Sequence, residues 1–184
     1  MKLSDTERNT LHLASELLAS KWREGQSKPL LIPHEGKPGT IDEVQANREA
    51  IRNYLQFRYA AEPREHFAML LLDFHGRMIE LVDVAKGSND SVNVPMREAM
   101  KAALAADAAN VVLVHNHPGG DATPSAQDIS MTEDWAKIFA RVGVNVQDHL
   151  VISSGGVTSI RAHLTVKSGR KANAREQLAQ WGAA

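Results

Sequence analysis

Residues 111–115, Val-Val-Leu-Val-His, constrain the fold of this 184-residue chain more than any other stretch. A short, continuous apolar run rich in β-branched residues is typical of a central strand that is buried on both faces. An alanine-rich segment at 96–110 precedes the run and favours a helix. Segment 126–142 follows the run and places apolar residues at helical spacing. A buried strand between two helices predicts an α/β fold.

The other predicted elements extend this unit on both sides. Alternating apolar patterns, glycine turns and helical periodicity divide the chain into segments. In chain order we expect a helix at 4–24, an irregular loop at 25–40, a helix at 41–59, strands at 66–73 and 77–84 joined by a turn at His75-Gly76, a polar loop at 86–93, a helix at 96–110, a strand at 111–115, a helix at 126–142, strands at 144–153 and 157–160, and a weak terminal helix in the polar tail. The order β-β-α-β-α-β-β predicts a mixed β-sheet flanked by helices.

These elements fall into three parts. Residues 1–60 are expected to form an N-terminal helical extension and linker, residues 61–166 the main domain, and residues 167–184 a polar C-terminal tail. A length of 184 residues suits one compact domain with appended structure of this kind.

Composition limits the classes of partner. The formal net charge is −1, whereas nucleic-acid-binding proteins usually carry a basic surplus, so charge does not support a nucleic-acid partner. No apolar run approaches the roughly 18 residues of a membrane span, and the N-terminus lacks an apolar signal core. The absence of cysteine excludes disulfides and thiolate zinc sites and fits a reducing compartment. We therefore expect a cytoplasmic protein that does not enter a membrane.

The segment after the central strand carries residues that suit a metal site. In an extended strand, residues two apart point to the same side, so His115 and His117 aim their imidazoles at one spot. Pro118 ends ladder pairing there, and two glycines turn the chain away. Asp128 falls in the first turn of the next predicted helix, where its side chain tilts back toward the histidines. Two imidazoles and one carboxylate leave a fourth position open, which is the ligand pattern of a catalytic zinc ion.

The same segment also has a purely structural interpretation. Ser125 followed by Asp128 fits the capping pattern of a helix start. His115 could be a core histidine that bonds to backbone groups. From the residues alone, both interpretations stay open.

A resemblance to a known family favours the metal site. The spacing H-x-H, seven residues, S, two residues, D is similar to the zinc motif of the JAMM (MPN/JAB) metalloproteases. The segments REHFAMLLLD, REAMKAALAADAANVVLVHNHPGGDATPSAQD and LVIS, the last preceded by DH, resemble segments of the bacterial RadC family, in RadC order, across residues 62–162. The resemblance implies a JAB/MPN-like, deaminase-like three-layer domain that binds one zinc ion per chain through His115, His117 and Asp128.

The resemblance also implies an activity. Proteins of the JAMM type are zinc-dependent metallohydrolases that cleave a peptide or isopeptide bond, so the implied substrate is a protein or peptide, with ubiquitin-like proteins among the candidates. Glu65 occupies the place of the family's glutamate, which takes a proton from the water that zinc activates. Glu98 is the competing candidate for this base, because Arg97-Glu98 also matches a RadC segment. Ser125 would help to stabilise the tetrahedral oxyanion.

Two alternative functions come from other classes. Full-length RadC proteins carry a helix-hairpin-helix DNA-binding region, but residues 1–60 show no glycine hairpin of that kind and no basic surplus. This departure weakens a role in DNA repair or recombination. The other alternative is a non-catalytic binding module in which zinc stabilises the fold, and a homodimer that involves residues 1–60 is compatible with the sequence.

The remaining polar candidates have structural interpretations. Asp148-His149 lies on a predicted strand with only one of its two side chains toward the core, and an ordinary polar pair is favoured over a partner for a histidine ligand. His66 and His75 are expected at the surface or in a turn.

Overall fold

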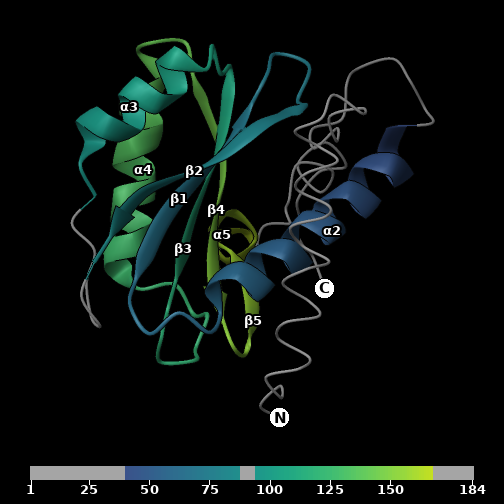
Figure 1. Cartoon of the computed structure of the whole chain (residues 1–184), viewed down its shortest axis with the longest axis vertical. Coiled ribbons are helices and arrows are strands. Elements are labelled where there is room, and N and C mark those ends of the chain that lie inside the picture. Colours follow the sequence, from purple (N-terminus) through teal and green to yellow (C-terminus); the bar gives the residue numbers. More distant parts are fainter. Residues whose placement is uncertain (1–39, 88–93, 168–184) are drawn as a thin grey trace.

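The computed structural model describes residues 40–87 and 94–167 of the chain. In chain order the elements of these residues are α2 (Thr40–Tyr59), β1 (His66–Leu72), β2 (Met78–Lys86), α3 (Met96–Ala105), β3 (Asn110–Asn116), α4 (Ala126–Ala140), β4 (Asn145–Ser153), β5 (Gly156–Ser159) and α5 (Ile160–Lys167). Figure 1 shows one sheet in the middle of the domain with helices on its two sides.

Several expectations fall on other parts of the chain. The helix expected at 4–24, the loop expected at 25–40 apart from its last residue, the loop residues 88–93 and the terminal helix of the tail lie outside the described residues. The division of the chain into three parts therefore stays a prediction. Among the described residues, no helix is both long enough and apolar enough to cross a membrane. The cytoplasmic location also stays a prediction.

The sheet has the strand order β2-β1-β3-β4-β5. β3 and β4 run parallel, and the other neighbouring strands are antiparallel. A parallel pair needs a crossover connection, and α4 forms it here. The predicted fold class, a mixed β-sheet flanked by helices, is confirmed.

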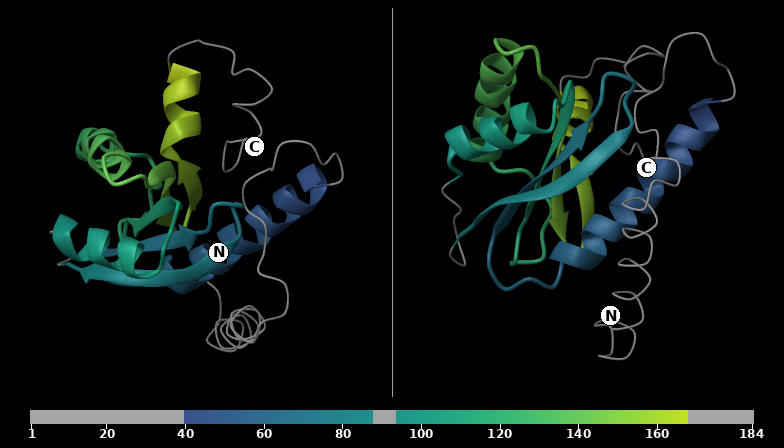
Figure 2. Two further views of the ribbon diagram at one scale, coloured as in Figure 1. Left: turned by 90° about the horizontal axis from the view of Figure 1, so that it is seen from above. Right: turned by 45° about the horizontal axis from the view of Figure 1, so that its top comes forward.

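Apolar side chains cover both faces of the central strands. On one face, Leu70 and Val112 belong to the same buried cluster as Leu55 of α2. On the other face, Leu113 belongs to a cluster that includes Phe139 of α4. Figure 2 shows α3 and α4 together on one side of the sheet and α2 along the other. Alternate residues of β3 therefore enter different cores.

One helix is shorter than predicted. The helix expected at 96–110 ends at Ala105. Asp107 has a φ of 50°, which takes the backbone out of the helical region. The alanine content favours a longer helix, but β3 pairing begins at Asn110, opposite Leu72 of β1, so the chain has to turn before that residue.

The sequence does not predict α5, which follows β5 without a loop. The Ser159 hydroxyl accepts a hydrogen bond from the Ala162 N–H at 3.0 Å and donates one to the Asp148 carboxylate at 2.6 Å. The same carboxylate accepts the Arg161 N–H at 3.2 Å. The start of α5 thus depends on a carboxylate from β4, a contact that no local pattern reveals.

We expect Leu55→Ala to lower the free energy of unfolding by about 2–5 kcal/mol, because the substitution leaves a cavity between α2 and the sheet. Leu55 is fully buried, with 0% exposure. Asn53→Ala, on the exposed side of the same helix, is the matched control and should change the free energy of unfolding by less than about 0.5 kcal/mol. Urea unfolding measures both variants, and equal effects would show that α2 is not held to the sheet by this face.

Candidate metal centre

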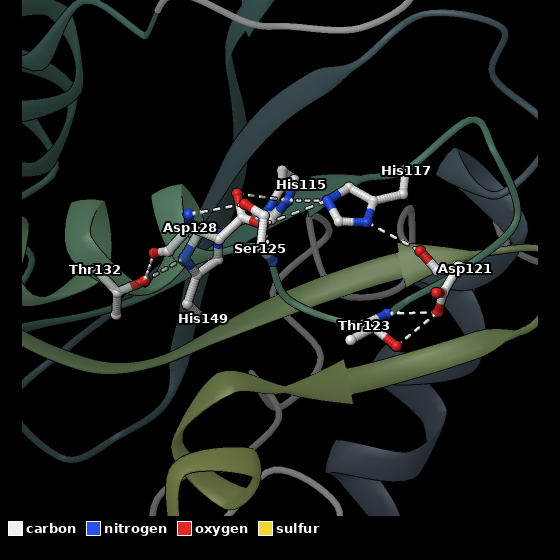
Figure 3. Close-up of polar contacts among 8 residues, drawn as sticks. All are labelled: His115, His117, Asp121, Thr123, Ser125, Asp128, Thr132 and His149. Atoms are coloured by element: carbon white, nitrogen blue, oxygen red, sulfur yellow. Dashed lines mark hydrogen bonds and ion pairs between the residues drawn. The ribbon is translucent and has the colours of Figure 1, made fainter.

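Three of the residues that the sequence singles out converge at the end of β3. His115 Nε2 lies 2.9 Å from His117 Nε2. The Asp128 carboxylate lies 3.2 Å from the first of these nitrogens and 3.4 Å from the second. One donor atom from each residue falls in a group whose members all lie within 4.8 Å of one another, so the group could hold a metal ion. Figure 3 shows the three side chains pointing toward one another.

A complete capping box turns Asp128 toward the histidines. Ser125 is the N-cap of α4, and its Oγ accepts the Asp128 N–H at 3.1 Å. In return, Asp128 Oδ2 accepts the Ser125 N–H and the Ser125 Oγ–H, each at 2.7 Å. Asp128 Oδ1 is the oxygen that faces His115. The predicted helix cap is confirmed, and the same cap delivers the carboxylate to the site.

The charges at the site favour a cation. Burial alone would raise the pKa of the Asp128 carboxyl, but its contacts with His115, His117 and Ser125 outweigh burial and hold this pKa well below its usual value. The hydrogen bond to Asp128 raises the pKa of His117, although burial opposes the rise. Both shifts favour positive charge beside the Asp128 carboxylate, at a place that a metal cation could take.

The loop after β3 orients His117. His117 Nδ1 lies 2.9 Å from the Asp121 carbonyl oxygen, which can only accept, so Nδ1 carries a proton and the neutral form of the ring presents its Nε2 lone pair to the site. The Asp121 carboxylate accepts the Thr123 N–H at 2.8 Å and the Thr123 hydroxyl at 2.7 Å, which holds the loop in shape. Gly120 has a φ of 88°, and a Cβ there would lie 3.1 Å from Ser154 Oγ, so the loop needs glycine at this point.

His149 lies directly behind His115, on the neighbouring strand β4. His149 Nε2 is 2.8 Å from His115 Nδ1, and Thr132 Oγ1 of α4 is 2.6 Å from His149 Nδ1. His149 is fully buried and packs edge-on against Phe67. Burial lowers the pKa of His149 well below its usual value, so the ring is neutral. The interpretation of Asp148-His149 as an ordinary polar pair is wrong, because His149 contacts a predicted ligand.

Asp148 is buried as well, so the expectation that only one of these two side chains faces the core is also wrong. Helices cover both faces of the sheet, so adjacent residues of β4 enter different cores. Asp148 accepts the Ser159 hydroxyl at 2.6 Å. Burial lowers the pKa of Arg48 in α2 to about 10, and the charge of Asp148 partly opposes this change. Asp148 therefore bonds to the start of α5 and interacts electrostatically with α2, on the side away from His149.

Asn116, between the two histidines, points to the opposite face and is buried with 1% exposure. Asn116 Oδ1 accepts the His66 N–H at 2.7 Å, and Asn116 Nδ2 donates to the Arg64 carbonyl at 3.1 Å. These two hydrogen bonds hold the backbone immediately before and after Glu65. Asn116 therefore ties the strand that carries the histidines to the start of β1.

Glu65 lies just before β1, at the same end of the central strands as the three converging residues. Phe67 pairs with His115 at the end of the antiparallel β1–β3 ladder, so Glu65, two residues before Phe67, lies at the same end of the strands as His117, two residues after His115. The charge of Glu65 contributes to the raised pKa of His117, which also places the carboxylate near that ring. Glu98, in contrast, is exposed and forms a 3.2 Å ion pair with Lys101. The geometry favours Glu65 over Glu98 as the candidate base.

The donor atoms suit a metal ion. Two imidazole nitrogens and one carboxylate oxygen are ligands that zinc prefers, and three protein ligands are typical of catalytic zinc sites. Within residues 40–87 and 94–167, this is the one group of three or more such residues close enough to share an ion. His75 is exposed in the β1–β2 turn, and His66 is half-buried beside Glu62, so neither belongs to the group.

Sequence reasoning missed Thr132 and Asn116 and gave His149 too little weight. Thr132 lies four residues after Asp128, a spacing that puts both on one helix face and could have signalled the contact. Asn116 lies between two residues that share a face, so strand alternation alone sends it to the other face. The approach of His149 to His115 depends on the register of β3 and β4, in which Val112 pairs with Asp148 and Leu113 with His149.

Comparisons with known proteins agree with this architecture. Residues 45–165 match a family described as the RadC-like JAB domain. A UPF0758 protein of Vibrio cholerae serotype O1 is 35% identical over 145 residues, which cover 79% of this chain and 82% of that protein. UPF0758 proteins of Polaromonas sp. and Methylibium petroleiphilum are 42% and 40% identical over 61% and 60% of this chain. The matched regions span 50% of each of these two relatives, so the chain corresponds to about half their length.

We expect His117→Ala and Asp128→Ala to abolish stoichiometric zinc binding, because each removes a donor from a three-ligand site. His75→Ala, in the exposed β1–β2 turn, is the matched control and should keep one zinc ion per chain. Metal analysis of zinc-treated, desalted protein measures the content. Unchanged zinc in both ligand variants would show that the ion, if bound, lies elsewhere.

Proposed function

Because the chain belongs to the RadC family, with a JAB/MPN-type domain, we propose that it is a zinc-dependent metallohydrolase of the JAMM type that cleaves a peptide or isopeptide bond. The observation that carries the proposal is the convergence of His115, His117 and Asp128 on one point at the end of a buried strand. A site that served only to stabilise the fold would not need a carboxylate base beside it. Glu65, a candidate for this base, lies at the same end of the central strands as the three ligand candidates.

Three residues are the proposed ligands of one zinc ion per chain. His115 and His117 would each offer Nε2, and Asp128 would offer the carboxylate that α4 already directs to the site. When bound, a zinc ion supplies Lewis acidity, which lowers the pKa of water and polarises a carbonyl group. The ligand set carries a single negative charge, that of Asp128, which would leave about half of the charge of a divalent ion uncompensated.

Glu65 is the proposed general base. Its carboxylate would accept a proton from the attacking water and pass it to the amide nitrogen that leaves. Proton transfer requires a base held at hydrogen-bonding distance. Asn116 accepts the His66 N–H and donates to the Arg64 carbonyl, and these two hydrogen bonds on either side of Glu65 support such an arrangement. The Glu65 carbonyl also accepts the Gly87 N–H at 2.7 Å, which fixes the backbone further.

Ser125 is the proposed donor to the oxyanion of the tetrahedral intermediate. In the structure its hydroxyl donates to Asp128 Oδ2, so the oxyanion would have to compete for this proton. The side chain is exposed, and its position beside the carboxylate is compatible with both contacts. Its first role is to orient a ligand.

The substrate is proposed at the level of class. We propose a protein or peptide, with ubiquitin-like proteins among the candidates, as the molecule that carries the scissile bond, because the resemblance to JAMM metalloproteases implies this class. A homodimer stays a prediction, and so do the alternatives of a DNA-repair-associated protein and a non-catalytic zinc-stabilised module.

We expect Glu65→Gln to reduce hydrolysis by about 10²–10⁴-fold while zinc content stays at one ion per chain, because the substitution removes a base and no ligand. Glu98→Gln is the matched control, since it makes the same chemical change at the competing candidate on the exposed face of α3. Quenched-fluorescent peptide libraries and isopeptide-linked ubiquitin-like conjugates serve as substrates. Loss of activity in Glu98→Gln with full activity in Glu65→Gln would reverse the assignment of the base.

Asn116→Leu should lower hydrolysis by about tenfold or more without loss of zinc, because a displacement of about 1 Å at the base is costly. Asn110→Leu, at the other end of β3, removes a second buried asparagine that also bonds to backbone. Both variants should be less stable toward urea, but only Asn116→Leu should lose activity in the folded, zinc-loaded state. An equal loss of activity in both would indicate a general effect on the fold.

A further inference from the structure

Four groups form a continuous chain of polar contacts behind the proposed metal site. His115 Nδ1 lies 2.8 Å from His149 Nε2. His149 Nδ1 lies 2.6 Å from Thr132 Oγ1, and Thr132 Oγ1 lies 2.6 Å from the Asp128 carbonyl oxygen. The chain begins at one proposed ligand and ends on the backbone of another, and Figure 3 shows these side chains together.

His149 is fully buried, and its two ring nitrogens contact a hydroxyl and an imidazole, so a charge on this ring would be buried beside neutral groups, which is costly. With a neutral His149 ring, one arrangement of protons satisfies all of these contacts. The Asp128 carbonyl can only accept, so Thr132 must donate its single hydroxyl proton to it. Thr132 Oγ1 then accepts from His149 Nδ1–H, which leaves the neutral His149 ring with a bare Nε2. His149 Nε2 accepts from His115 Nδ1–H, so the lone pair of His115 lies on Nε2, the atom that faces His117 and Asp128.

We propose that His149 and Thr132 are positioning residues that fix His115 in its Nδ1–H tautomer, so that His115 binds the metal through Nε2. The proposal rests on the metal binding of the proposed function and not on hydrolysis. The Nδ1–H tautomer of His117 is fixed by a different acceptor, the Asp121 carbonyl oxygen. Two bare nitrogens 2.9 Å apart repel each other unless a proton or a metal cation lies between them, so this pair of tautomers suits a shared metal ion.

The identity of the partner matters. A histidine ligand often donates its second N–H to a carboxylate or a backbone carbonyl, which fixes its tautomer. Here the acceptor is a fully buried imidazole and not a carboxylate, so the contact orients His115 without adding negative charge. The burial of His149 against Phe67 keeps water from replacing the ring.

The zinc affinity of the full chain tests the proposal, measured by competition with a chelating dye at one fixed pH. His149→Phe keeps an aromatic ring but removes the acceptor, and it should weaken zinc binding by about 10–100-fold. Thr132→Val should weaken binding several-fold, because the hydroxyl that orients His149 is lost, whereas Thr132→Ser keeps the hydroxyl and should match the parent protein. Thermal unfolding of the metal-free variants checks that each is folded.

A direct measurement on the unaltered protein completes the test. Long-range ¹H–¹⁵N spectra of the zinc-loaded chain should show His115 protonated at Nδ1 and bound through Nε2. Binding through Nδ1, or equal zinc affinity in Thr132→Val and Thr132→Ser, would overturn the proposal. Absence of zinc binding by the parent protein would instead overturn the proposed function together with this inference, whereas zinc binding without hydrolysis would leave the inference standing.

Discussion

Side chains at the end of β3 point alternately to the two faces of a sheet that is covered on both sides, and the site uses both directions. His115 points toward the face covered by α3 and α4, where it meets His149 and the start of α4. Asn116 points toward the face of α2 and binds the backbone around Glu65. Two adjacent residues of one strand thus have different roles: His115 is a proposed ligand, and Asn116 holds the segment that carries the proposed base. A shift of one residue in the β3 register would turn each of these side chains to the opposite face of the sheet, so neither could keep its contacts.

The start of α4 links the local structure to the chemistry. Asp128 Oδ2 accepts two hydrogen bonds from Ser125, while Oδ1 faces His115, so one carboxylate both starts the helix and completes the ligand set. The Asp128 carbonyl then receives the hydroxyl of Thr132, which orients His149. Loosening of this first turn would therefore disturb a ligand and the hydrogen-bond chain behind another ligand at once. If the site binds a metal as proposed, metal affinity and the stability of α4 would be coupled through this turn.

The sequence predicts the parts of this site that depend on short-range geometry. His115 and His117 are two residues apart on a strand, and Asp128 lies in the first turn of a capped helix, so local periodicity brings them close. His149 reaches His115 only because β3 and β4 pair in one register. Asp148, on β4, accepts a backbone N–H at the start of α5. Such contacts depend on how distant segments pair, which local patterns do not encode. The early end of α3 has the same origin, since the pairing of Asn110 with Leu72 overrides the helix preference of alanine.

The direction of α4 adds a constraint on any cation at this site. Its N-terminal turn lies beside the two histidines, and the positive end of a helix dipole disfavours a nearby cation. Neutral imidazoles do not offset this repulsion, and the partner of His115 is a neutral ring as well. Asp128 is the charge that makes the site favourable, and its depressed pKa keeps it ionised. A divalent ion held by one carboxylate next to a helix N-terminus would keep about half of its charge uncompensated, which would strengthen its action on a carbonyl group or a water molecule.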